Sequence, residues 1–468
     1  MAFISSTDIM QLWQYRIAEF KLFINDGKTN IKEYDLKERL RSIIITNDYE
    51  GNLYPLFRVG CVMEADVYYD MIRYKNNSQI HIRIQKFYRK VGEETTSLVR
   101  DYINDKFNLI LEDSDFDTGK ATRERRDKNN YKQRSESTYN DLVYVDNDIE
   151  LFLYKKEFNE KLNILVNAIL QDVNTFDALL YLFDKAKLKN ILISRPDNSN
   201  NYKELVIPPM KIKDAIKWVD TYYGLYNTAM MFYVDIIKGI TYILKYNGQC
   251  TAYRHNEPQN TCIMIPKDKG INHMIPCNLK KEDNDTDYIV VNNETVHIRN
   301  ESITHNMLNE SDIISIDSYS GNINTLKSDI NIGEQRSVKV IENNTENPFF
   351  GNIYVSKIGT KDTVVELTLS DFDIDSITPN RKFKLLFEDS ELANKYNGNY
   401  KITSIAHTFL RNGRDFKINS IAIMKKNKII KRDIWISIYL SLIITDCWDL
   451  SQKYYYRFYY QQYLYFLF

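Results

Sequence analysis

The sequence is poor in the residues that build disulfide frameworks and tight turns. Its 468 residues include 5 cysteines, 15 glycines and 9 prolines. A sparse and odd set of cysteines argues against a disulfide scaffold as the source of stability. The N-terminus has no basic stretch followed by an apolar run, so we expect no secretory signal. We therefore expect synthesis and folding in the reducing cytoplasm of a host cell.

The sequence also lacks an excess of charge of either sign. Lysine and arginine total 62 against 63 aspartate and glutamate residues, which gives a formal net charge of −1. This balance offers no electrostatic reason for the chain to wrap nucleic acid or to lie on an anionic membrane. Hydrophobic residues, by contrast, make up 43% of the chain, and tyrosine alone accounts for 35 positions. We expect a folded protein with extensive cores and no nucleic-acid binding.

Common catalytic motifs are missing as well. There is no glycine-rich phosphate loop, no Gly-x-Ser-x-Gly elbow and no His-Glu-x-x-His helix. Only 6 histidines are present, and two of them, His81 and His407, lie inside strand patterns that favour a structural role. We therefore predict a protein without enzymatic activity, with no catalytic residue and no cofactor.

Two groups of potential metal ligands have unsuitable spacing. The first group comprises Cys250, Cys262, His273 and Cys277. Only its last two members are close together, whereas structural zinc sites usually pair ligands two to four residues apart. The second group comprises Asp371, Asp373 and Asp375. A calcium loop would need glycine and glutamate where Ser376 and Lys382 stand, so we expect a polar bend between strands and no metal site.

Hydrophobic periodicity and composition predict a β-rich α+β fold, with two all-β units flanking a mixed α/β central segment; the resemblance described below implies that these two units are β-barrel-like domains. Alternation at Ile80, Ile82 and Ile84 indicates a strand with one buried face, and Asn412-Gly413 indicates a hairpin between two long strands. Six parts follow from such signals. They are 1–118 (first β-barrel-like domain), 119–141 (charged linker or loop), 142–276 (mixed α/β module), 277–345 (polar, weakly specified insertion), 346–426 (second β-barrel-like domain) and 427–468 (C-terminal tail).

Two of these parts carry open alternatives. The charged segment 119–141 contains no large aliphatic side chain, so it is either a solvated linker or a basic finger that contacts nucleic acid or an acidic partner. The tail 427–468 is an aberrant extension, a docking segment for a partner, or a membrane anchor. Its apolar run over 434–444 is too short to span a bilayer, so we expect no stable membrane insertion.

The stretch ELVIPPMKIKDAIKWVDTYYGLYNT, residues 204–228, combines two prolines, a helical pattern and an aromatic end. We expect Pro208 and Pro209 to end the preceding strand, because proline cannot donate a ladder hydrogen bond. One helical face carries apolar residues, and Gly224 suits a left-handed C-terminal cap. That face consists of Ile212, Ile216, Val219 and Tyr223. The next segment reads as a hairpin around 237–239.

This stretch resembles a pattern in the baseplate hub proteins of contractile phage tails, which are also similar to the N-terminal part of type VI secretion spike proteins. Two further segments resemble the flanking β units of the same family. These are YEGNLYPLFRVGCVMEADVYYDMI upstream, and ITPNRKFKLLFED with NGNYKITSIAHTF downstream. The resemblance spans about residues 10–425. It implies a homotrimer with two related β-barrels per subunit, forming a pseudo-sixfold ring in the virion baseplate. The implied partners are further copies of the chain, the tail tube protein, the central spike protein and other baseplate proteins.

The aromatic stretch then becomes a hypothesis about assembly. We expect it to hold an interdomain or intersubunit angle, with the alternative that its side chains fill the core of one subunit. The residues concerned are Pro208, Pro209, Trp218, Tyr222, Tyr223, Gly224 and Tyr226. The leading function is a structural virion protein that joins tail tube to spike. The alternatives are a tail-associated cell-wall hydrolase component and a receptor- or glycan-binding tail module.

Overall fold

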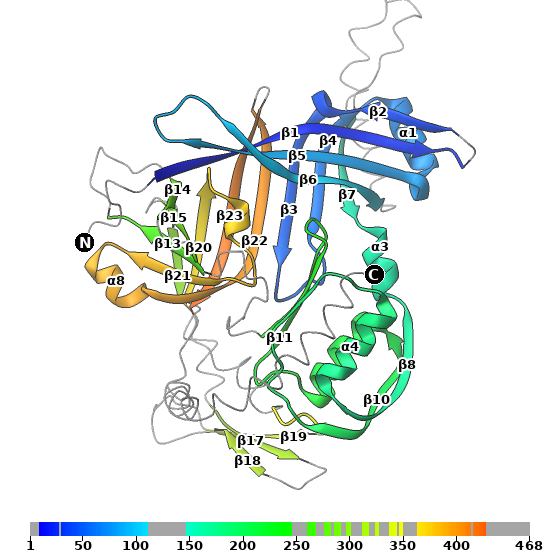
Figure 1. The fold of residues 1–468 in the computed structure, drawn as a ribbon, viewed down its shortest axis with the longest axis vertical. Helices are drawn as coiled ribbons and strands as arrows, with labels where there is room; N and C mark the ends of the chain where they lie inside the picture. The colour runs from blue at the N-terminus through cyan, green and yellow to red at the C-terminus, as the bar shows by residue number, and fades with distance from the viewer. Residues whose placement is uncertain are drawn as a thin grey trace, which may run out of the picture. The chain divides into compact units, whose positions relative to one another are not determined.

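The computed structural model describes residues 9–27, 30–110, 147–245, 260–267, 276–281, 285–291, 296–300, 311–317, 323–326, 337–343, 346–349, 363–412 and 415–426. Strands dominate these residues, and the predicted β-rich α+β fold is confirmed (Figure 1). The predicted linker 119–141 and the tail 427–468 lie outside the described residues. No helix in the described part of the chain is both long and apolar enough to cross a bilayer.

The secondary structure elements run as follows. The first strands are β1 (Ile9–Asn25), β2 (Ile31–Asp35), β3 (Leu40–Asp48), β4 (Leu56–Met63), β5 (Ser78–Lys90), β6 (Ser97–Ile110) and β7 (Asn147–Tyr154). The middle strands are β8 (Leu165–Asn174), β9 (Ile191–Ile193), β10 (Asn201–Lys211), β11 (Met230–Asp235), β12 (Ile240–Lys245), β13 (Asn260–Ile265), β14 (Cys277–Lys280), β15 (Thr286–Val290) and β16 (Val296–Asn300). The last strands are β17 (Ser311–Asp317), β18 (Ile323–Leu326), β19 (Ser337–Asn343), β20 (Thr363–Ser370), β21 (Lys382–Phe387), β22 (Gly398–Asn412) and β23 (Asp415–Lys426).

Helices are few and short. The α-helices are α1 (Ala65–Arg73), α3 (Lys156–Leu162), α4 (Thr175–Ala186), α5 (Ile212–Trp218) and α8 (Ser390–Tyr396). Single turns of 3-10 helix are η1 (Lys37–Arg39), η2 (Lys75–Asn77) and η5 (Ile374–Ser376), and a π-helical turn, η3 (Val219–Tyr223), continues α5. Helices therefore serve mainly as connections and as cover for strands.

Strands of the large sheet close into two rings that share members. One ring runs β22-β3-β4-β7-β6-β5-β1-β23, and β23 returns to β22. The other runs β1-β14-β15-β13-β21-β22-β23, and β23 returns to β1 through the pair Tyr15 and Phe416. Closing a sheet on itself removes the exposed edges that otherwise invite aggregation. Two closed β units are therefore present, as the sequence predicted.

The two rings are fused through β1 and the long β22–β23 hairpin. Residues 398–400 of β22 pair with β21, while residues 404–410 pair with β3. Strand β1 likewise pairs with β14 near its start and with β5 along most of its length. The predicted parts 1–118 and 346–426 thus contribute strands to a common sheet. Their boundaries as separate domains stay a prediction.

Alternating burial explains why these segments form strands. Ile80, Ile82 and Ile84 of β5 are fully buried, and the residues between them are partly exposed. This is the period-two pattern of a sheet with one face on the core. The hairpin predicted at 412–413 is confirmed, because β22 and β23 pair from Tyr400 to Asn412.

The mixed module contains two small sheets. Strands β8 and β10 form one antiparallel pair, and α4 packs against β8 and α5 (Figure 1). Strands β11, β12 and β9 form the other, so the predicted hairpin around 237–239 is confirmed. The N-cap of α4 is Asn174, which forms a reciprocal capping box with Asp177.

The strand end expected at Pro208 and Pro209 is wrong. Strand β10 continues through Pro208 and Pro209, because a β-bulge between Ile207 and Met210 removes these positions from the ladder. Within the segment 277–345, β14 and β15 join the large sheet and β16 pairs with β20. Pairing partners that are distant in sequence decide both outcomes.

Candidate functional site

The predicted aromatic corner begins with a well-buried helix. Ile212, Ile216 and Val219 are fully buried and Tyr223 nearly so, which confirms the apolar face. The last turn widens into the π-helix η3, in which the Gly224 N–H donates to the Val219 carbonyl at 3.1 Å. A widened turn of this kind leaves carbonyl groups that need partners from outside the helix.

Two asparagines supply those partners. The Asn347 amide nitrogen donates to the Asp220 and Thr221 carbonyls at 3.0 and 3.1 Å. The Asn198 amide nitrogen donates to the carbonyls of Tyr223 and Gly224, both at 2.8 Å. Both asparagines are buried. The helix end is therefore tied to the segment between β19 and β20 and to the loop between β9 and β10.

Gly224 is fixed by this arrangement. Its φ of +78° lies in the region that favours glycine, although its ψ of 118° differs from the expected left-handed cap. A Cβ at this position would lie 2.2 Å from Asn347 Oδ1 and 2.7 Å from Asn347 Cγ. Both the backbone conformation and the space therefore require glycine here.

The corner aromatics also cover the outer edge of β10. The Val206 N–H donates to the Tyr223 hydroxyl at 2.7 Å, and the Trp218 indole N–H donates to the Val206 carbonyl at 3.1 Å. These bonds satisfy backbone groups on the side of β10 away from β8, as a neighbouring strand would. The prolines at the bulge then lie where no ladder donor is needed.

The remaining corner aromatics divide between core and surface. Tyr226 is fully buried, and its hydroxyl donates to the carbonyls of Ser194 and Ile243. Tyr222 is partly exposed and stacks on Trp218 with ring centroids 4.8 Å apart. The structure thus brings the predicted residues together, and the core-filling alternative describes Tyr226 best. Whether the corner sets an interdomain or intersubunit angle stays a prediction.

A second cluster, which the sequence did not predict, lies where the rings meet the mixed module. It contains Lys86 of β5, Arg100 of β6, Lys238 of the β11–β12 turn, and Asp373 and Asp375 at η5. Lys86 Nζ lies 2.6 Å from Asp373 Oδ1 and 2.8 Å from Asp375 Oδ2. Arg100 Nη2 contacts Asp375 Oδ2, and Lys238 Nζ lies 3.0 Å from Asp375 Oδ1. We call these five residues the ionic cluster.

Burial and charge compete within the ionic cluster. Burial opposes ionisation of Asp375, but the attraction of Lys238 and Lys86 outweighs it and holds the pKa of this carboxyl below its usual range. Burial raises the pKa of neighbouring Asp373, and the charge of Asp375 adds to that rise against the opposing effect of Lys86. Asp375 is therefore a stable anion, whereas Asp373 ionises less readily than an ordinary aspartate.

His407 lies close enough to respond to the same charges. It is buried in β22, and its Nδ1 lies 2.8 Å from the Ser420 hydroxyl. Burial, together with the positive charge of Lys238, lowers its pKa to about 3. A neutral, hydrogen-bonded histidine in a strand agrees with the structural role expected from the sequence.

The groups weighed as metal sites have other partners or lie apart. Asp373 and Asp375 are bound by ammonium and guanidinium groups, and η5 between β20 and β21 is the polar bend that was expected. Cys262 and Cys277 are buried in a small apolar cluster, and burial raises the pKa of both thiols. Cys250 and His273 lie outside the described residues. Within the described ranges no group of three candidate metal ligands forms.

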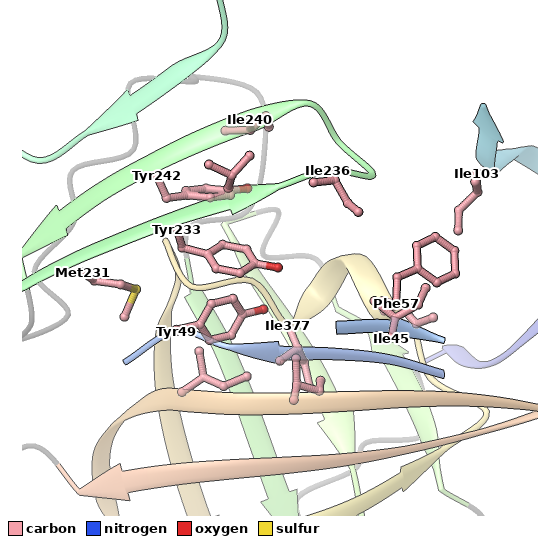
Figure 2. Packing of buried hydrophobic residues seen from close by; sticks show 14 of the residues in the cluster. Ile45, Tyr49, Phe57, Ile103, Met231, Tyr233, Ile236, Ile240, Tyr242 and Ile377 are labelled. Carbon is pink, nitrogen blue, oxygen red and sulfur yellow. The ribbon is translucent and has the colours of Figure 1, made fainter. Parts of the chain in front are cut away.

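Around the ionic cluster, apolar contacts hold the module on the rings. Figure 2 shows Tyr233 of β11 above Tyr49, beside Ile236 and Ile377. The two tyrosine rings meet edge to face with centroids 4.8 Å apart, and both are almost fully buried. The Tyr233 hydroxyl donates to Asn47 Oδ1 at 2.6 Å. Sequence patterns could mark these strands as apolar but could not pair them across such distances.

Comparisons with known proteins give a family and several distant structural relatives. The tail protein from Neisseria meningitidis MC58 is 8% identical with a TM-score of 0.43, and the match covers 89% of this chain and 97% of that one. The 43 kDa tail protein of prophage MuSo2 from Shewanella oneidensis is 10% identical with a TM-score of 0.43, covering 88% and 99%. The E. coli c3393 protein, a component of the type VI secretion system, is 7% identical with a TM-score of 0.36, covering 88% and 77%.

No curated protein matches the chain. The family model described as bacteriophage PBS1 gene 109 protein matches residues 13–446, which is most of the sequence. The chain therefore belongs to the bacteriophage PBS1 gene 109 protein family.

Proposed function

We propose that the chain is a structural protein of a phage tail, a baseplate hub or tail-tip component that joins the tail tube to the central spike. In this role it acts as a homotrimeric ring in the virion, and its partners are the tube protein, the spike protein and other baseplate proteins. The family membership supports a phage role. The sequence resemblance to tail hubs supplies the more specific assignment.

The observation that carries the proposal is the pair of strand rings fused within one subunit. Three copies of a chain with two similar units present six units around a threefold axis. Such an assembly can meet a sixfold tube on one side and a threefold spike on the other. Closed rings also suit a building block, because they leave fewer strand edges available for wrong contacts.

The test is the assembly state of the purified full-length chain. Mass measurement in solution and negative-stain imaging should show trimers and annular particles with threefold or pseudo-sixfold symmetry. A monomer at micromolar concentration that forms no annular particle would overturn the proposal. Incubation with peptidoglycan and with glycan arrays examines the alternatives, and turnover or saturable sugar binding without ring assembly would favour them.

The corner residues make a narrower proposal within this function. We expect Tyr223 and Tyr226, together with Gly224, to hold an interdomain or intersubunit angle through the contacts of this helix end. The double variant Tyr223→Ala, Tyr226→Ala should then assemble into annular particles of altered diameter, or should not assemble. If the double variant formed normal annular particles, the corner residues would only fill the core of one subunit.

A further inference from the structure

The strand ring β22-β3-β4-β7-β6-β5-β1-β23 has two outer walls of different chemistry. Over β1, β5 and β6 the wall is charged. Arg83 pairs with Glu19 and with Asp101, both at 3.2 Å, and Lys21 lies 3.7 Å from Glu19. Partly exposed ion pairs of this kind are typical of a surface in water. The β1, β5 and β6 wall is therefore suited to face solvent.

Over β23, β22, β3 and β4 the outer wall of the same ring is made of uncharged side chains (Figure 1). Ala406 lies opposite Ile421 on one side and Thr46 on the other. Leu56 lies opposite Thr46, so one row of side chains crosses four strands. The row points outward, because the alternate residue Ile405 is fully buried inside the ring.

A second row of the same wall lies beside the first. Thr408 lies opposite Ile44, and Ile44 lies opposite Arg58 at the β4 end. Arg58 is the one charged residue of these two described rows, and it pairs with Glu150 at 3.2 Å. We call the uncharged part of these rows the neutral wall. Its residues are Ile44, Thr46, Leu56, Ala406, Thr408 and Ile421.

The composition of the neutral wall is that of a covered surface. Leu56 and Ile421 are exposed, and the other members are partly exposed. Single exposed apolar residues are common, but a contiguous uncharged patch marks an interaction site. The centres of protein interfaces are likewise depleted in charged residues. Alanine and threonine side chains are also small, so a second sheet can pack face to face at about 10 Å.

A second apolar sheet face lies on β8 and β10 of the same chain. Leu165 is 75% exposed and Ile169 is 64% exposed. Val206 lies opposite Ile169 and is also exposed. Trp218 continues this surface at the β10 edge, where its indole N–H donates to the Val206 carbonyl, and Tyr222 stacks on it. Two unlike faces on one chain that both need cover are what a head-to-tail ring requires.

We propose that the neutral wall of one subunit binds the β8–β10 face of the next copy of the chain. This inference rests on the ring assembly proposed above and names its contact surface. Five strands from β20 to β4, about 4.8 Å apart, with residues 404–410 rising about 3.4 Å each, give the wall roughly 600 Å². A contact that buries on the order of 1,000 Å² over both partners reaches the size of a specific interface.

The test is the mass in solution of the full-length protein and of arginine variants, each checked for folding by its urea unfolding midpoint. Ala406→Arg should raise the dissociation constant of the subunits about a hundredfold or more, because the contact would bury an unpaired charge. Leu56→Arg, at a more exposed position of the neutral wall, should have the same effect. Asn104→Arg is the matched control on exposed β6 of the charged wall, and it should leave assembly unchanged.

A mixing experiment tests the other side of the contact. Ile169→Arg on β8 should also dissociate the assembly. Equal amounts of Ala406→Arg and Ile169→Arg should then form a one-to-one dimer, because each variant keeps the face that the other needs. If the folded wall variants stay assembled, or if the mixture stays monomeric, the contact is wrong even where wild type is a trimer. A wild-type ring of another size that these variants dissociate would support the contact and overturn the trimer, whereas a monomeric wild type would overturn both.

Discussion

Replacing Gly224 by alanine tests the packing of the aromatic corner. An alanine at a φ of +78° costs about 1–2 kcal/mol in backbone strain. Its Cβ would lie 2.2 Å from Asn347 Oδ1, so the Asn347 side chain must move and release the Asp220 and Thr221 carbonyls. Each of these two hydrogen bonds contributes about 0.5–1.5 kcal/mol. The sum predicts that Gly224→Ala destabilises the fold by about 2–5 kcal/mol.

Gly239 provides a matched control for this variant. Its φ is +66°, but a Cβ there would meet nothing within 4 Å. Gly239→Ala should therefore cost only the backbone strain of about 1–2 kcal/mol. The assay is urea unfolding followed by tyrosine and tryptophan fluorescence, with m-values compared to confirm that the same transition is observed.

A double-mutant cycle with Asn347→Ala isolates the contact itself. Once the Asn347 side chain is gone, Gly224→Ala should cost only its backbone strain, which predicts a coupling of about 1–3 kcal/mol between the two sites. If Gly224→Ala were no more destabilising than Gly239→Ala, or if the coupling were zero, the packing of Asn347 against this helix end would not contribute to stability.

Three further outcomes follow from the described contacts. Tyr223→Phe removes the hydroxyl that accepts the Val206 N–H, so we expect a loss of about 1–2 kcal/mol and faster amide exchange at Val206; unchanged exchange would contradict the edge-covering role. Lys86→Met leaves Asp373 and Asp375 without their buried cation, so we expect a loss of about 3–5 kcal/mol, whereas Lys21→Met, which breaks an exposed pair with Glu33, should leave the unfolding midpoint unchanged. Burial lowers the pKa of His407 from 6.5 to about 3 on folding, so its contribution to the free energy of unfolding is fully present above pH 6.5 and is lost as pH falls toward 3. His407→Gln should flatten the pH dependence of the free energy of unfolding between these values. An unchanged slope would refute the effect of burial on His407.

Local patterns were sufficient to predict the elements whose signals lie within a few residues. The alternation at Ile80, Ile82 and Ile84 marks β5, because one face of a strand must be apolar to join a core. The hairpins β11–β12 and β22–β23 are also visible, because their turns need small or polar residues at fixed positions. Such features depend on neighbours in the sequence and on little else.

Other features depend on partners that no local pattern identifies. Pro208 and Pro209 read as a strand end, yet β10 continues because its pairing with β8 crosses a bulge between Ile207 and Met210 that takes both prolines out of the ladder. The ionic cluster joins Lys86 to Asp375 across 289 positions, and a single chain offers no signal for that pairing. The aspartates at η5 therefore resembled a cation loop, since the cations that bind them come from distant strands.

The fused rings couple the two ends of the described chain during folding. Strand β1 pairs with β5, which is near in the sequence, whereas β3 pairs on one side with β22, which lies far along the chain. Long-range pairing of this kind slows folding and leaves strand edges exposed in the interval. The anions that pair with Lys86 of β5 are also distant in the sequence, because Asp373 and Asp375 lie 287 and 289 positions away.

Because its members lie far apart in the sequence, the ionic cluster also affects how the strand rings close. A ring that closed without η5 in place would bury the Lys86 ammonium without an anion. Such a state carries the full penalty of an uncompensated buried charge. The cluster therefore favours the single closure in which residues 373–375 meet Lys86, and it ties completion of the rings to arrival of the C-terminal strands.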